Sequence, residues 1–218
     1  MTDLWPTCQP YLDAIGVACA CLEATLRDGV PEPSVPYIDR TDEMPVNSHP
    51  THSDFVRCFP GRDMWPLRNL SDITGITIHH SMSHSPLATA RYCTAGKGYP
   101  TIQYHYWVSA SDGCECYMLV DPAVALWHDH TGAHPRTLSV ALAGRWDHHT
   151  PPGEQLQAVA ELCVWLMHQY AIPTGEVKGH TDRAGRNKYG KPITVCPGWY
   201  SGVWHDTFFK ILADTMGD

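Results

Sequence analysis

The sequence predicts an α/β protein with a single mixed central β-sheet flanked by helices, preceded by a short helical and proline-rich N-terminal extension. Three patterns support this fold class. Residues 75–79 alternate apolar and polar side chains as a buried strand does, and two β-like runs flank a Ser-Asp-Gly turn at 111–113. Residues 153–170 carry one apolar stripe at helical spacing. With 218 residues, 43% of them hydrophobic, the chain can bury one good core.

The N-terminal part is predicted to be an extension and not a second domain. Residues 11–28 place apolar side chains at helical spacing and are followed by Gly29, which predicts a helix. From about 30 to 66 the chain is rich in proline and has little periodicity, which is typical of an extended surface connector. We therefore expect an extension at 1–64 and the main domain at 65–218.

The main domain is expected to contain strands and helices in a defined order. Gly75–His79 is predicted to be a strand that ends at its histidine. Ser85 and Pro86 supply an N-cap and a first-turn proline for the helix that follows. Cys163 lies on the apolar stripe of its helix and is assigned to the core. The remaining predicted elements are strands at 101–110, 114–121 and 137–144 and helices at 153–170 and 202–216.

Composition excludes several classes of function. The net charge of −8 and the pI near 5.9 argue against nucleic acid as a partner, because phosphate binding needs a basic surface. No run of about 18 apolar residues predicts a membrane span, and the first residues lack a signal-peptide pattern. We expect cytoplasmic synthesis without membrane insertion. The nine cysteines are an odd number without a secretory signal, which favours reduced thiols over a disulfide framework.

Two separated parts of the chain offer metal ligands. Residues 76–81 read Ile-Thr-Ile-His-His-Ser, and 179–182 read Gly-His-Thr-Asp, followed by Thr-Val-Cys-Pro-Gly at 194–198. Together they can supply two imidazoles and one thiolate. Three such ligands fit a tetrahedral zinc whose fourth position stays open for water, as in a hydrolytic site. Hydrolysis is therefore the first hypothesis.

These segments, with the Tyr-His-Tyr strand at 104–106 and the Asp-Gly at 112–113, resemble the type 2 N-acetylmuramoyl-L-alanine amidases. That family includes the phage lysozyme-like amidases and the peptidoglycan recognition proteins. The resemblance covers about residues 65–216, with several motifs in the same order and spacing. It implies that His79, His180 and Cys196 hold one zinc ion.

The resemblance also assigns residues to catalysis. Tyr104 matches the family's catalytic tyrosine, and Thr194 stands where relatives carry Lys or Thr as the group that polarises the substrate. A threonine hydroxyl can donate a hydrogen bond to the developing oxyanion but supplies no positive charge. The glutamate that serves as general base in the recycling branch is replaced by Ala141, which leaves the general base open. This replacement places the chain nearer the phage and recognition-protein branch.

Two further histidines are assigned to substrate binding. His128 matches a family position that lines the substrate groove, with an exposed loop histidine as the alternative. His80 follows His79 directly, and successive strand side chains point to opposite faces, so a regular strand cannot aim both at one metal.

The implied function is zinc-dependent hydrolysis of the amide between N-acetylmuramic acid and L-alanine in bacterial peptidoglycan, by a monomer. The missing signal peptide fits a phage or prophage endolysin that reaches the cell wall after release at lysis. Two alternatives stay open. A host muropeptide-recycling amidase is disfavoured by Ala141, and a non-catalytic peptidoglycan-binding protein is disfavoured because all three ligands are present.

Overall fold

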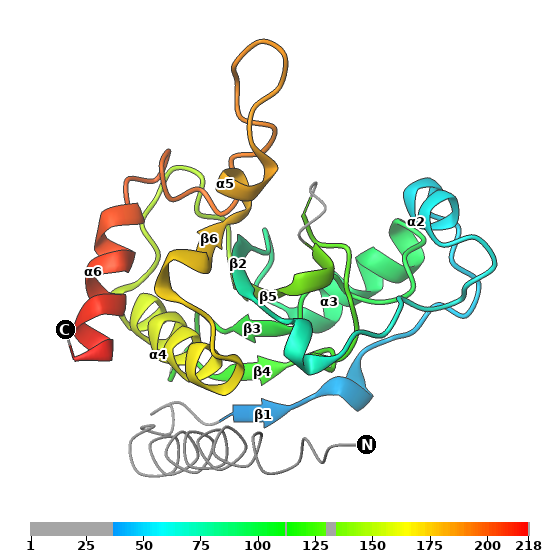
Figure 1. Cartoon of the computed structure of the whole chain (residues 1–218), viewed down its shortest axis with the longest axis horizontal. Coiled ribbons are helices and arrows are strands. Elements are labelled where there is room, and N and C mark those ends of the chain that lie inside the picture. Colours follow the sequence, from blue (N-terminus) through cyan, green and yellow to red (C-terminus); the bar gives the residue numbers. More distant parts are fainter. Residues whose placement is uncertain (1–36, 112, 130–133, 218) are drawn as a thin grey trace, which may run out of the picture. The chain divides into compact units, whose positions relative to one another are not determined.

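The computed structural model describes residues 37–111, 113–129 and 134–217, and its centre is a six-stranded mixed sheet with the order β1-β4-β3-β5-β2-β6 (Figure 1). Strands β3 and β4 pair antiparallel, and the other neighbouring strands pair parallel. The strands are β1 (Tyr37–Asp39), β2 (Gly75–His80), β3 (Tyr106–Val108), β4 (Cys116–Met118), β5 (Thr137–Leu142) and β6 (Val177–Gly179). The predicted α/β class with a mixed central sheet is confirmed.

Helices cover both faces of the sheet. They are α2 (Ser53–Cys58), α3 (Pro86–Arg91), α4 (Gly153–Tyr170), α5 (His180–Ala184) and α6 (His205–Met216), and a π-helix (Tyr92–Gly96) continues from α3. Helices α4 and α6 pack on one face, while buried side chains of α2 and α3 belong to the cluster on the other. None of the described helices has the length and hydropathy that crossing a membrane requires.

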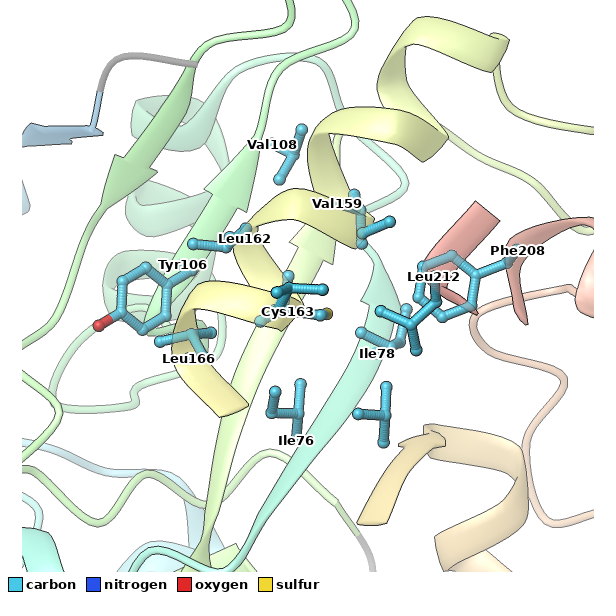
Figure 2. Close-up of a cluster of buried hydrophobic side chains, with 14 of the residues drawn as sticks. Ile76, Ile78, Tyr106, Val108, Val159, Leu162, Cys163, Leu166, Phe208 and Leu212 are labelled. Carbon is cyan, nitrogen blue, oxygen red and sulfur yellow. The ribbon is translucent and has the colours of Figure 1, made fainter. Parts of the chain in front are cut away.

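Successive side chains of the central strands point to opposite faces of the sheet, so the core consists of two clusters of buried residues. All residues of β2 and β5 are buried. Ile76 and Ile78 of β2 face α4 and α6, where Cys163 and Phe208 join the same cluster (Figure 2). Burying each aliphatic side chain contributes about 1.5–3 kcal/mol relative to leaving it exposed. The core position predicted for Cys163 is confirmed, since this residue is fully buried.

Residues 37–64 contribute to the same sheet and core. Strand β1 extends the sheet beside β4, and Phe55 of α2 is fully buried with its ring edge-on to Trp65, 4.9 Å between centroids. Neither element is predicted from the sequence, because this part of the chain is rich in proline and has little periodicity. The predicted helix at 11–28 lies outside the described residues, and the division of the chain at residue 65 stays a prediction.

Most predicted elements occur, with differences at their ends. Helix α4 has the predicted bounds, and the Ser85 side chain accepts a hydrogen bond from the backbone N–H of Ala88 at 3.2 Å, as an N-cap does. Strand β3 is shorter than predicted. The amides of Leu119 and Val120 both approach the carbonyl of His105, at 2.8 and 3.4 Å, which interrupts the regular ladder before Tyr106.

Gly179, the last residue of β6, packs where no side chain fits. A Cβ at this position would lie 2.4 Å from the ring of Trp199, which is fully buried. We expect Gly179→Ala to destabilise the protein by about 1–3 kcal/mol through overpacking. Gly175→Ala is the matched control, because a Cβ there meets nothing within 4 Å. Thermal unfolding of the metal-free chain tests this: Gly179→Ala should lower Tm by about 2–4 °C per kcal/mol. Equal Tm values for the two variants would contradict the packing argument.

Candidate functional site

Two histidines lie at the carboxyl ends of neighbouring parallel strands. His79 is the next-to-last residue of β2, and His180 directly follows β6 and opens α5. The register pairs Ile78 with Gly179, so the next residue of each strand lies at the same edge of the sheet. The two imidazole rings are 4.7 Å apart between centroids. The strand pairing therefore brings together two imidazoles that are about a hundred residues apart in the sequence.

Cys196 approaches the two histidines from the loop after α5. Its carbonyl accepts a hydrogen bond from the N–H of Thr181 at 2.6 Å, and its N–H donates to Oγ1 of Thr194 at 3.1 Å. The N–H of His80 points at its sulfur, with N and Sγ 3.4 Å apart. These contacts place Sγ 3.6 Å from Nδ1 of His79. One ligand atom from each of His79, His180 and Cys196 lies within 4.8 Å of the other two.

This geometry fits a zinc ion. With bonds of about 2.0–2.1 Å to nitrogen and about 2.3 Å to sulfur, a tetrahedral zinc holds these two ligands about 3.6 Å apart. The distance from Nδ1 of His79 to Sγ of Cys196 has that value. Two imidazoles and one thiolate also form a donor set that zinc prefers, and they leave one position open. His79, His180 and Cys196 could therefore hold one ion.

Burial sets the protonation of these ligands in the metal-free chain. Burial, followed by the neighbouring His180 and His128, lowers the pKa of His79 well below its ordinary value of 6.5. The imidazole is thus neutral at pH 7, as a metal ligand must be. Burial raises the pKa of the Cys196 thiol to about 12. This thiol therefore carries its proton at neutral pH until a metal displaces it.

Tyr104 lies beside His79, with 5.5 Å between ring centroids. Burial, with smaller contributions from Cys196 and Cys93, raises its pKa far above the ordinary value of 10. Its hydroxyl therefore stays protonated and can donate a hydrogen bond. Tyr104 also lines a neighbouring cavity of about 620 Å³. Lys97 contributes a positive charge to the same cavity.

The family model described as N-acetylmuramoyl-L-alanine amidase matches residues 69–199, which is more than half of the chain. The chain belongs to this amidase family. No curated protein sequence matches it.

The chain also shares its fold with solved structures. One is the Ph2119 endolysin of a Thermus scotoductus MAT2119 bacteriophage, with 17% identity, a TM-score of 0.57 and coverage of 84% of this chain and 100% of that one. Another is the amidase LysC of Clostridium intestinale URNW, with 16% identity, a TM-score of 0.55 and coverage of 84% of this chain and 99% of that one. A third is Drosophila peptidoglycan recognition protein SD, with 16% identity, a TM-score of 0.56 and coverage of 79% of this chain and 95% of that one.

His128 lies behind His79, the first candidate ligand. Its Nδ1 is 3.3 Å from Nε2 of His79, and its own Nε2 is 3.3 Å from the carbonyl of Thr137 and 3.1 Å from the hydroxyl of that residue. The side chain is fully buried. If Nδ1 of His79 faces a metal, the Nε2–H of His79 donates to Nδ1 of His128. The Nε2–H of His128 in turn donates to Thr137. The structure thus places the buried His128 against a candidate ligand, which rules out an exposed loop histidine, and its place in the substrate groove stays a prediction.

His80 points to the opposite face of β2, as strand alternation requires. Its Nδ1 accepts a hydrogen bond from the N–H of Trp146 at 3.2 Å, and its Nε2 lies 3.4 Å from a carboxylate oxygen of Asp147. The side chain is buried, and its predicted role in substrate binding stays a prediction. The backbone N–H of His80 contacts the sulfur of Cys196.

Other predicted positions are placed as follows. Thr194 accepts its hydrogen bond from the backbone of Cys196 and is half-buried, so its own hydroxyl proton is left to donate elsewhere. Ala141 pairs in register with His79 and, on its other side, with Trp107. It brings a methyl group, and not a carboxylate, next to the ligand.

The sequence did not indicate several residues whose side chains support the surroundings of the site. Thr137 and Asp147 contact His128 and His80 only because the fold brings them together. The side chain of Arg183 is buried and donates to the carbonyls of Ile76 and Glu176 at 3.2 and 2.7 Å. No local pattern in the sequence marks these three roles.

Zinc binding should release a proton from Cys196. Because the thiol is protonated below its raised pKa of about 12, lowering the pH weakens binding. With one such proton the apparent affinity should rise about tenfold per pH unit at pH 7–9. Calorimetric titration at pH 8, in buffers of different ionisation enthalpy, counts the proton. Cys196→Asp is the control, because an ionised carboxylate has none to release. If the wild type and this variant released equal numbers of protons, the protonation argument would fail.

Removing His128 should loosen the metal. We expect His128→Ala to lower zinc affinity about 10–100-fold, because a hydrogen-bonding partner that orients a ligand is lost. Competition with a chromogenic chelator measures the affinity. His84→Ala, at an exposed position, is the matched control and should bind zinc like the wild type. Unchanged affinity in a folded His128→Ala protein would show that His79 needs no such support.

Proposed function

We propose that this chain is a zinc-dependent N-acetylmuramoyl-L-alanine amidase that hydrolyses the amide between N-acetylmuramic acid and L-alanine in bacterial peptidoglycan. The observation that carries the proposal is the convergence of two imidazoles and one thiolate beside Tyr104, in a member of the amidase family. The donor set leaves a fourth position open, which is the arrangement of catalytic and not of structural zinc.

The side chains around the site suit amide hydrolysis. When bound, zinc would supply Lewis-acid activation of a water molecule and of the amide carbonyl. The protonated hydroxyl of Tyr104 can donate a hydrogen bond to the developing oxyanion. Thr194 can add a second donor, because its oxygen already accepts from the backbone and its proton is left for the substrate. A neutral hydroxyl contributes less here than a charged lysine would.

The cavity beside Tyr104 has room for a stem peptide. Its volume of about 620 Å³ lies within the usual range for small-molecule sites, about 300–1,000 Å³. Polar side chains from several elements line it, among them His52, Ser83 and Gln103. The ammonium of Lys97 suits a peptide carboxylate, which stem peptides carry.

Within the amidases, we assign the chain to phage or prophage endolysins that act on the cell wall as monomers after release. The fold that it shares with the Ph2119 endolysin supports this assignment. The methyl group of Ala141 weighs against the recycling branch, whose glutamate would stand at that place. The intact donor set weighs against a pure binding protein.

Mass spectrometry of digested peptidoglycan tests the activity. The zinc-loaded protein should release intact stem peptides that begin with free L-alanine, and chelation should abolish the release. Tyr104→Phe should keep its zinc and lose about 10²–10³ in kcat, as the loss of one oxyanion donor costs. Fragments cut in the glycan or within the peptide would show that the bond is assigned wrongly. If the protein sedimented with the wall without releasing anything, the binding-protein alternative would replace the enzyme.

A further inference from the structure

A short hairpin projects from the fold between α5 and Cys196, in orange at the top of Figure 1. A bridge between Arg186 and Pro192 closes it, and the N–H of Asn187 donates to the carbonyl of Lys191 at 2.8 Å. The side chain of Asn187 accepts from the N–H of Tyr189 at 2.9 Å and from that of Lys191 at 3.2 Å. The hairpin, residues 186–192, therefore has a defined turn and presents its side chains in a fixed order.

The hairpin is positively charged in an otherwise acidic protein. It carries Arg186, Lys188 and Lys191, all exposed, and residues 183–205 contain no Asp or Glu, although the whole chain has a net charge of −8. Over the described residues, no ion pair to a carboxylate involves these three cations. Their charge is available to a partner.

An aromatic side chain lies among these cations. Tyr189 is 75% exposed, and Nζ of Lys188 lies 5.0 Å from the centre of its ring. The segment that leads back to the site continues with exposed Ile193 and Val195. An amphipathic ring between cations suits a polymer that presents both apolar and anionic groups.

We propose that this hairpin is a second contact for peptidoglycan, which binds the carboxylates of stem peptides adjacent to the one being cleaved. The proposal rests on the proposed function. Lys191 stands five positions before Cys196 in the chain, so its Cα lies within about 18 Å of the Cα of that candidate ligand. A polymer held at that site carries further stem peptides within this reach.

Because salt screens distant charges, a local cluster of cations at the polymer matters more for binding than the net charge of the chain. At physiological salt the Debye length is about 8 Å, so acidic side chains on distant parts of the surface repel the wall only weakly. Cations directly at the polymer are screened less. The hairpin thus offers a reason why a chain with a net charge of −8 can approach an anionic wall.

The test compares two triple variants of the full zinc-loaded chain. R186Q/K188Q/K191Q removes the hairpin charges, and R57Q/R62Q/K210Q removes three exposed cations elsewhere, so that the net charge changes equally. Each exposed charge contact contributes up to about fivefold in binding affinity. We expect the hairpin variant to need about tenfold more intact sacculi for half-maximal rate, with unchanged turnover of a soluble N-acetylmuramoyl dipeptide. The control should match the wild type on both substrates.

Equal activity of both triple variants on sacculi overturns the hairpin proposal. Failure of the wild type to cleave even the soluble substrate would instead overturn the proposed function, so the two failures are distinguishable. Sacculi whose carboxylates have been amidated should abolish the difference between wild type and hairpin variant. Sacculi stripped of phosphate polymers by hydrofluoric acid should retain it. If stripping abolished the difference and amidation did not, phosphate polymers would be the partner and the carboxylate assignment would be wrong.

Discussion

The parallel pairing of β2 with β6 is the constraint on which the site depends. With Ile78 opposite Gly179, the next residues of the two strands are His79 and His180, and both lie at one sheet edge. This register is held from both sides, because Ile76 and Ile78 are buried against α4 and α6 while Trp199 fills the space beside Gly179. Core packing therefore positions the ligands, and a slip of one residue would turn His79 to the wrong face.

A layer of hydrogen bonds refines that placement. His128 and Thr137 lie behind the ring of His79, and the N–H of His80 reaches the sulfur of Cys196. The side chain of His80 is meanwhile held on the other face of the sheet, next to Asp147. Two successive histidines of one strand thus serve the site in different ways, one through its ring and the other through its backbone. Such outer contacts orient the ligands of a metal centre and contribute about 10–100-fold to its affinity.

Local patterns predicted the elements, and long-range contacts explain what they missed. The apolar stripe of α4 and the cap at Ser85 are readable because helix periodicity and capping depend on neighbours in sequence. The three candidate ligands came from a family resemblance, and the structure brings them together. The burial of His128 and the contribution of β1 to the sheet arise from segments far apart in the chain, so no window of sequence contains their cause.

The central claim is that two imidazoles and one thiolate of this chain hold one zinc ion at the edge of the sheet. X-ray absorption spectroscopy at the zinc edge of the loaded protein tests it most directly. We expect one sulfur at about 2.3 Å from the zinc and two imidazole nitrogens at about 2.0–2.1 Å, with the remaining position filled by a light atom. A first shell without sulfur, or one with several sulfurs, would contradict it.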